Sequence, residues 1–511
     1  MIPAPTTTVT STVGGRRQGR NGTIIALIIL GFSAAECFTP AAATVNYTYP
    51  AITIAVTIYL IAQRRVDDAI ELNLWTWATA AGLRRMVDWG TGHFNSSSLI
   101  LVAASVAALI IGATALRSHR RWPPGFSYAG FIIVAAGVSA CAIGVLANGV
   151  VPAAVSAVLW FAPLGIGLVT LAAGADRPRY LTAILRFTRW ALPLLGGYAL
   201  LQWALAPAWD VFWLHNVAPS ALKLGSPFGT PQPFGLRPAS LVNSPFGFAH
   251  LMVFLLFSQL GRVKGRPWAY VSVTLGCAAL AITGIRSAWL TAAVAVVVLA
   301  ISRRMRLWPL VLLGVPAAFA ALTFVPQLAD SVGRRLQSLQ SGSSDISLSA
   351  RLGTYTQALP SFFRDPIGAG MGATGSGARA NPQDVPAFGA LDSSYLEIVR
   401  TAGSLLGSLV VITLIVLAVT VFNRSRLARL PYPAWGAIAL ALPIDMLLGN
   451  VTSGPTAVVT WLILGMCGGL GVHSSTRPIA APDWPDQHTL QPSGAGDRAL
   501  PLRTDHLPSS G

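Results

Sequence analysis

The chain has 511 residues, of which 53% are hydrophobic and only 10% are charged, and its formal net charge is +17. Soluble proteins carry about 25% charged residues, so this composition excludes an ordinary soluble domain. The positive charge is almost entirely arginine that flanks apolar runs, which is typical of the positive-inside pattern of membrane proteins. No basic stripe with interleaved aromatic residues is present, so we expect no nucleic acid partner.

Apolar runs of the length that a bilayer core requires follow one another along the chain. They predict an all-α, polytopic integral membrane protein with 13–14 transmembrane helices. The runs lie at residues 23–39, 47–62, 97–115, 126–147, 150–173, 190–207, 245–260, 267–283, 287–302, 307–325, 402–421, 433–449 and 455–472.

The predicted organisation has five parts. Residues 1–22 form a cytoplasmic N-terminal tail, membrane helices occupy 23–325, a large outer loop occupies 326–400, and further membrane helices occupy 401–472. Residues 473–511 are rich in Pro, Ser and Gly and lack an apolar pattern, which predicts a disordered cytoplasmic tail. A loop of about 75 residues is longer than an ordinary connection and therefore indicates function.

The path of residues 64–96 conflicts with the arginine pattern. Two spans from a cytoplasmic N-terminus return the chain to the cytoplasm at Arg64, whereas the run 97–115 must begin outside. One more crossing is therefore needed, and residues 69–83 are the candidate. That crossing would leave Arg84 and Arg85 outside, against the positive-inside rule.

Arginines recur in segments that this topology places outside. Arg237, Arg286 and Arg351 stand out, because each lies beside or within an outer segment that adjoins a helix. Arginine binds phosphate in a bidentate geometry and stays charged, so the three suit a lipid-linked pyrophosphate. The alternative is that they contact lipid phosphates or pair with nearby acidic residues. The three outer segments are 208–244, 283–289 and 326–400.

The stretch 365–375 reads "DPIGAGMGATG". It lacks the Gly-Lys-Ser/Thr ending and the strand–helix setting of a nucleotide-binding loop. We therefore expect a flexible turn that lets the backbone fold back toward the membrane.

Four stretches, in the same order, resemble motifs of the O-antigen ligase and polymerase-like family of bacterial envelope glycosyltransferases. The resemblance covers about residues 190–421. The stretches are "GLRPASLVNSPFGFAH", "TGIRSAWL", "SARLGTYTQALPSFFRDPIGAGMG" and "DSSYLEIVRTAGSLLG".

The resemblance implies an enzyme that transfers or polymerises a glycan from an undecaprenyl-pyrophosphate carrier to a glycan acceptor. It places this reaction at the outer face of the bacterial cytoplasmic membrane, among membrane lipids, in cell-surface polysaccharide biosynthesis and without a metal or cofactor. Arg237, Arg286 and Arg351 occupy the positions of the family arginines assigned to the pyrophosphate. Tyr395 and Glu397 match the motif that closes the large loop. We expect Tyr395 to bind substrate and Glu397 to provide a catalytic carboxylate.

Asp392 is a departure from the ligase pattern. Ligases have His at this position and Asn where this chain has Ser393, which favours the polymerase-like branch. Asp392 and Glu397 form an acidic pair at the junction of loop and helix, where a carboxylate can act as general base and arginines can stabilise the leaving pyrophosphate. Asp392 can instead cap the helix that begins near Ser393, and the two roles are compatible.

A lipid-linked oligosaccharide flippase or other transporter is the alternative function. Transporters place ionisable groups near the middle of the membrane, whereas this chain has few, and His250 and Asp445 lie toward the outer ends of their runs. The four cysteines lack the spacing of a zinc site, so no metal is expected.

Overall fold

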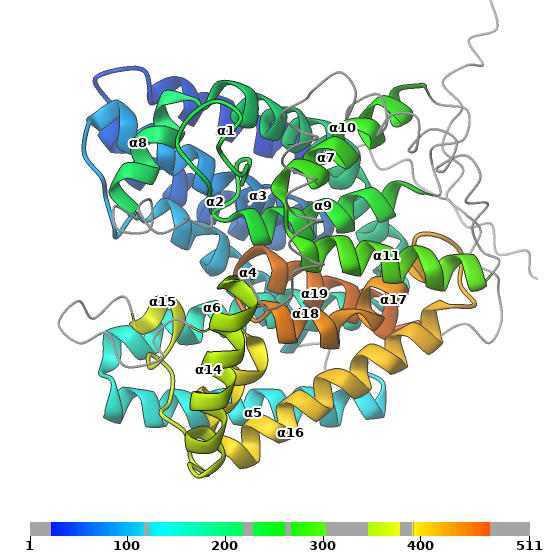
Figure 1. Ribbon diagram of the computed structural model, residues 1–511. Coiled ribbons are helices and arrows are strands. Elements are labelled where there is room, and N and C mark those ends of the chain that lie inside the picture. Colours follow the sequence, from blue (N-terminus) through cyan, green and yellow to red (C-terminus); the bar gives the residue numbers. More distant parts are fainter. Residues whose placement is uncertain are drawn as a thin grey trace, which may run out of the picture. The chain divides into compact units, whose positions relative to one another are not determined.

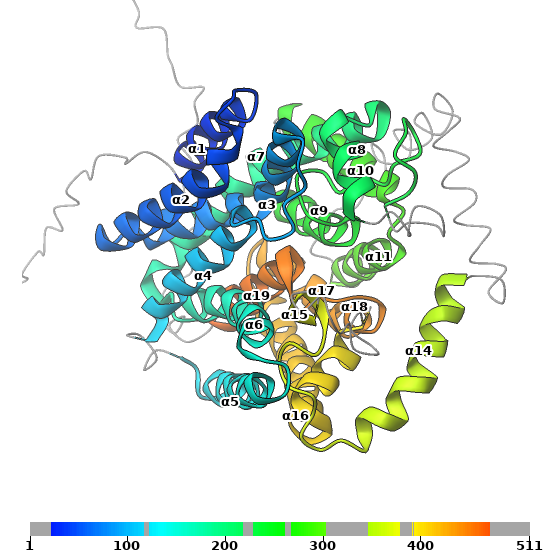
Figure 2. The ribbon, with the colours of Figure 1, turned by 90° about the vertical axis from the view of Figure 1, so that its left-hand side faces the viewer.

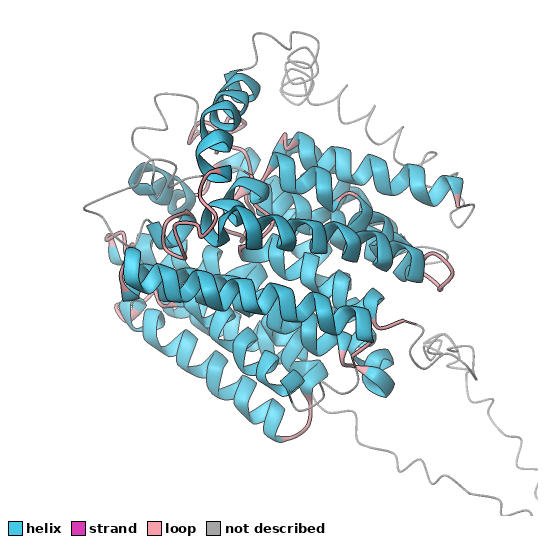
Figure 3. Cartoon of the chain, turned by 90° about the horizontal axis from the view of Figure 1, so that it is seen from below, coloured by secondary structure: helices cyan, strands magenta, loops and turns pink. Residues whose placement is uncertain are grey.

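The computed structural model describes residues 22–116, 122–217, 228–260, 267–302, 346–378, 391 and 393–470, with the backbone alone for 346–352. Within these ranges the regular elements are helices, and no strand occurs (Figure 3). Several of the helices are apolar and long enough to cross a bilayer. The prediction of an all-α, polytopic membrane protein is therefore confirmed.

Four described helices have the length and apolar composition of membrane spans: Ala42–Ala62, Pro124–Ala147, Val150–Leu171 and Ser394–Ser425. A bent pair at Gly174–Leu205 and Ala208–Val217, with an angle of 78° between its parts, becomes a fifth if it is one broken span. Six shorter apolar helices accompany them in the described part of the chain. The count of 13–14 spans stays a prediction, and the run 307–325 lies outside the described residues.

Five helices from the first half of the chain pack around one long helix, α3 (Val66–Thr91). Its neighbours are α1 (Gly22–Glu36), α2 (Val45–Ala62), α4 (Ile100–Leu116), α7 (Arg177–Leu205) and α8 (Ala208–Val217) (Figures 1 and 2). With 26 residues at 1.5 Å per residue, α3 is about 39 Å long. This length exceeds the bilayer core of about 30 Å, but α3 is not among the described helices that have the apolar composition of a membrane span.

Arg84 and Arg85 of α3 are buried and paired. Arg84 lies 3.3 Å from Asp88 on the next turn of the same helix, and Arg85 lies 2.9 Å from Asp210 on α8. A charged side chain inside a membrane protein is tolerated when it faces the bundle and pairs with an opposite charge. The two arginines are therefore accommodated inside the bundle, and the crossing at α3 stays a prediction.

A second group of helices gathers at α16 (Ser394–Ser425). The helices α5 (Pro124–Ala147) and α19 (Gly454–Gly468) pack against it, and α6 (Val150–Leu171) packs against α5 and α19. The remaining described helices continue the bundle. They are α9 (Pro245–Gln259), α10 (Pro267–Thr283), α11 (Arg286–Ile301), α14 (Ile346–Phe363), the short α15 (Gly375–Ala378), α17 (Tyr432–Leu440) and α18 (Leu442–Leu448) (Figures 1 and 2).

The helix α16 breaks at Gly403, whose φ and ψ are 82° and 167°. This backbone conformation divides α16 into a short segment, 394–402, and a longer apolar segment, 404–425. The predicted border between the outer loop and the membrane helix, at residue 400, therefore lies beside this break. The short segment carries Tyr395 and Glu397.

Cysteine labelling tests the predicted topology. In a variant with the four native cysteines replaced, Ser343→Cys should react with a membrane-impermeant maleimide in intact cells, because 326–400 is predicted to be outside. Ser475→Cys should react only after the membrane is opened. Labelling of Ser475→Cys but not Ser343→Cys in intact cells would reverse the assigned faces. Both serines lie outside the described residues.

Candidate functional site

Glu397 is held through one of its two carboxylate oxygens. Asn450 Nδ2 donates a hydrogen bond to Glu397 Oε2, and Thr452 Oγ1 donates to the same oxygen at 3.0 Å. Hydrogen bonds to a carboxylate are among the stronger ones in proteins. The side chain of Glu397 is therefore fixed in position without an ion pair to any described residue.

The other carboxylate oxygen, Glu397 Oε1, makes no hydrogen bond with the described residues, and the side chain lines a cavity. A β-carbon added at Gly375 would lie 3.3 Å from this oxygen, so the glycine keeps the space beside it open. An anchored carboxylate that lines a cavity and keeps one oxygen uncommitted can accept a proton from a bound hydroxyl group.

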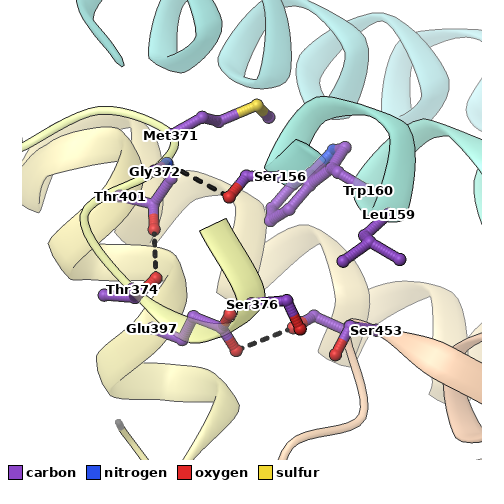
Figure 4. A pocket seen from close by; sticks show the side chains of 11 residues that line it. Ser156, Leu159, Trp160, Met371, Gly372, Thr374, Ser376, Glu397, Thr401 and Ser453 are labelled. Carbon is purple, nitrogen blue, oxygen red and sulfur yellow. Dashed lines mark hydrogen bonds between the residues drawn. The ribbon is translucent and has the colours of Figure 1, made fainter. Parts of the chain in front are cut away.

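The Glu397 cavity has a volume of about 40 Å³, room for a few water-sized groups. Its wall is dominated by hydroxyl groups, with one indole and two apolar side chains (Figure 4). Four separate parts of the chain contribute to it: α6, residues 371–376, α16 and residues 452–453. The lining residues are Ser156, Leu159, Trp160, Met371, Gly372, Thr374, Ser376, Glu397, Thr401, Thr452 and Ser453.

The loop that carries Asn450 and Thr452, residues 449–453, is attached to α16 by Ser394. The Ser394 hydroxyl donates to the Gly449 carbonyl at 3.0 Å and accepts a hydrogen bond from the Val451 amide at 2.7 Å. Ser394 is fully buried, so these bonds are shielded from water and strengthened. The serine beside the predicted catalytic cluster thus brings the two partners of Glu397 into place.

The other hydroxyls of the "DSSYLE" stretch also contact α18. Ser393 donates to the Met446 carbonyl at 3.1 Å, and the Tyr395 hydroxyl donates to the Pro443 carbonyl at 2.8 Å. Tyr395 is not among the residues that line the Glu397 cavity. The structure gives its hydroxyl a docking contact with α18, and its predicted contact with substrate stays a prediction.

The stretch 365–375, here called the glycine turn, packs between helices. Its backbone forms hydrogen bonds with α16, from the Gly370 amide to the Thr401 carbonyl at 3.1 Å, and with α5, from the Met371 amide to the Ala140 carbonyl at 2.8 Å. Asn148, at the end of α5, donates to the carbonyls of Ala369 and Met371. The turn does fold back onto the membrane helices, as predicted, and it forms one wall of the Glu397 cavity.

Arg237 and Arg286 are partly exposed, and each lies at the border of an ordered element. The Arg237 amide donates to the Phe228 carbonyl at 2.7 Å, next to a single bridge between Gly229 and Leu236. Arg286 is the first residue of α11. The prediction that these two side chains and Arg351 converge on one cavity remains open, because the side chain of Arg351 lies outside the described residues.

Asp392 lies outside the described residues, so its predicted roles as base and as helix cap both stay predictions. The structure does describe its neighbours, Leu391 and Ser393, which are buried at the beginning of α16. Arg400, the last arginine of the predicted outer loop, lies over the Phe362 ring at 5.3 Å and 4.0 Å from Asp365. This arginine therefore has a structural role at the glycine turn.

His250, Asp445 and Thr291 form a buried cluster that joins α9, α18 and α11. Asp445 Oδ1 lies 3.2 Å from His250 Nε2 and accepts a hydrogen bond from the Thr291 hydroxyl at 2.6 Å. The second nitrogen of His250, Nδ1, lies 2.9 Å from the Phe246 carbonyl. His250 and Asp445 thus have hydrogen-bond partners within this cluster of three helices, as buried polar groups require.

Sequence reasoning did not find Asn450, Thr452 and Trp160. The first two lie in "GNVTSG", a short polar interruption between the apolar runs 433–449 and 455–472, and that interruption was the available signal. Trp160 lies inside an apolar run, where a tryptophan is indistinguishable from a packing residue.

The comparison with known proteins gives one family match. Residues 270–405 match the family model described as O-antigen ligase, and this range contains Arg286, Arg351 and Glu397, whereas Arg237 precedes it. No curated protein shows a sequence match to the chain. The resemblance predicted from the motifs is confirmed, and the chain carries a domain of the O-antigen ligase family at residues 270–405.

Proposed function

We propose that the protein transfers a glycan from an undecaprenyl-pyrophosphate carrier to a hydroxyl group of an acceptor glycan, at the outer face of the bacterial cytoplasmic membrane. The family domain supports glycosyl transfer of the ligase or polymerase kind. The observation that carries the proposal is Glu397, which lines a hydroxyl-rich cavity, is anchored through Oε2 and has no partner for Oε1 among the described residues.

In the proposed reaction, the oxygen of an acceptor hydroxyl attacks the anomeric carbon of the donor sugar. Glu397 Oε1 takes the proton of that hydroxyl. The new glycosidic C–O bond forms while the bond from that carbon to the pyrophosphate oxygen breaks, and the electron pair leaves with the pyrophosphate. Asn450 and Thr452 hold the carboxylate in the geometry that general base catalysis needs. The proton is later released to water.

Arg237, Arg286 and Arg351 are proposed to bind the pyrophosphate and to stabilise the charge that it gains as it leaves. Fixed cations at the position where charge develops make a large contribution to catalysis. With these cations in place no metal ion is needed, and the polymerase branch of the family is favoured because Asp392 replaces the ligase histidine.

The direct test uses purified protein in lipid nanodiscs with an undecaprenyl-pyrophosphate-linked oligosaccharide extracted from the source cells. Glycan transfer should yield a longer glycan and free undecaprenyl pyrophosphate in equal amounts. In sealed vesicles a flippase would instead move the lipid-linked substrate across the bilayer and leave it chemically unchanged. That result would overturn the proposal.

Lysine substitutions test the phosphate role of the arginines. Arg286→Lys and Arg237→Lys should each lower the transfer rate about 10- to 100-fold, because lysine keeps the charge and loses the bidentate hydrogen bonds. The measurement is the initial rate of carrier release at matched protein amounts.

Arg189→Lys is the matched control. Arg189 is exposed on α7, lies over the Trp190 ring at 5.5 Å and does not line the Glu397 cavity. Its rate should equal that of the unmodified protein. Full activity of both Arg286→Lys and Arg237→Lys would remove these arginines from the pyrophosphate site.

A further inference from the structure

We propose that Trp160 and the hydroxyl groups of the Glu397 cavity form a subsite for one pyranose ring of the acceptor glycan. This inference rests on the proposed function, since the sugar whose hydroxyl reaches Glu397 Oε1 is the one that attacks. The inference adds two points to that function. The group that enters the cavity belongs to a sugar ring, and Trp160 is the side chain that selects it.

Trp160 lies on the same face of α6 as Ser156, one helical turn away, and both line the cavity (Figure 4). Gly137 of α5 makes room for the indole, because a β-carbon at that glycine would approach Trp160 Nε1 to 3.0 Å. The ring is therefore packed against α5 on one side and remains partly exposed. Its N–H makes no hydrogen bond with the described residues.

A partly exposed indole beside hydroxyl groups matches the two kinds of surface on a sugar. The C–H face of a pyranose is apolar and stacks on an aromatic ring, which combines a large apolar body with a polar N–H. The hydroxyls of a sugar both donate and accept hydrogen bonds, as serine and threonine do. Ser376, whose hydroxyl has no partner among the described residues, lines the cavity close to Glu397 (Figure 4).

The size of the cavity indicates how the sugar enters it. About 40 Å³ accommodates a few water-sized groups and is too small for a complete pyranose. The hydroxyl-bearing edge of the ring therefore points inward to Glu397 Oε1, and the remainder of the ring lies against Trp160 at the opening. This orientation presents one hydroxyl to the base and so selects the linkage that forms.

Binding of simple sugars tests the subsite without requiring turnover. Protein in lipid nanodiscs, free of sugar-based detergent, is mixed with a panel of methyl glycosides, and saturation transfer from protein to ligand is recorded by NMR. At least one glycoside should receive saturation on the C–H protons of one ring face. Trp160→Ala should weaken its binding about tenfold, whereas Trp160→Phe should retain part of it.

Trp190→Ala is the matched control, because Trp190 is 45% exposed on α7 and does not line the cavity. It should bind the glycoside as the unmodified protein does. Equal binding by Trp160→Ala, or binding of no glycoside by the unmodified protein, would overturn the subsite.

Transfer kinetics separate the subsite from the proposed function. Trp160→Ala should raise the KM for the acceptor and leave the KM for the lipid-linked donor unchanged, which a general loss of structure would not do. A change in donor KM alone would assign Trp160 to the donor sugar and contradict the inference. Transfer that depends on Glu397 but not on Trp160 would leave the function standing without the subsite. Glycoside binding through Trp160 in a protein with no transfer activity would leave the subsite and remove the function.

Discussion

Glu397→Gln should reduce glycan transfer about 100- to 10,000-fold, the contribution of a positioned general base. Glutamine has the size of glutamate, and its amide can still meet Asn450 and Thr452, so the bundle should remain folded. The glutamine side chain is uncharged and cannot act as a base toward a hydroxyl group. The measurement is the rate of carrier release from the lipid-linked substrate, at equal amounts of folded protein in nanodiscs.

Two further variants sharpen this test. Thr452→Val removes one of the two donors to Glu397 Oε2 and leaves the carboxylate in place, so its rate should fall between those of the unmodified protein and Glu397→Gln. Glu36→Gln is the control, since Glu36 ends α1 and does not line the cavity, and it should leave the rate unchanged. A Glu397→Gln protein with more than about one tenth of normal activity would exclude Glu397 as the base.

The helices, and the place of Glu397 in the first turn of α16, could be predicted from the sequence because both depend on local pattern. Apolar runs mark the helices that meet lipid, and the run predicted at 126–147 corresponds to α5 at Pro124–Ala147. The chain around α3 is different, because its charges are neutralised by other helices, as in the pair of Arg85 and Asp210. Hydropathy averaged along the chain does not show that a charged residue has an ion-pair partner far away in the sequence.

The partners of Glu397 were missed for the same reason. Asn450 and Thr452 lie 53 and 55 residues from Glu397, and their approach depends on how the 449–453 loop docks on Ser394. For the glycine turn, the sequence predicted the turn but not the residues against which it packs. Its glycines predicted a turn that folds back to the membrane, but the glycines that receive it, Gly144 and Gly403, lie in distant helices and look like ordinary helix residues.

Gly370→Ala should destabilise the folded protein by about 2 to 5 kcal/mol and abolish transfer. Gly370 has φ of 77°, a left-handed conformation that costs other residues about 1–2 kcal/mol. An added β-carbon would also overlap the backbone of Gly144 on α5, and overpacking of this kind costs about 1–3 kcal/mol. The affected turn carries Met371, Gly372 and Thr374 of the cavity wall. Thermal unfolding and the transfer rate are the measurements.

The reciprocal variant distinguishes this close approach from a local effect on the turn. Gly144 lies within α5, and a β-carbon there would overlap the Met371 carbonyl, so Gly144→Ala should lower stability and activity although alanine favours a helix. Gly197→Ala is the matched control, because a β-carbon at Gly197 on α7 meets no atom within 4 Å, and it should be neutral or stabilising. Normal stability of both Gly370→Ala and Gly144→Ala would show that the turn does not pack on α5. The cavity wall would then have to be formed by other residues, and the assignment of Glu397 to this cavity would fail with it.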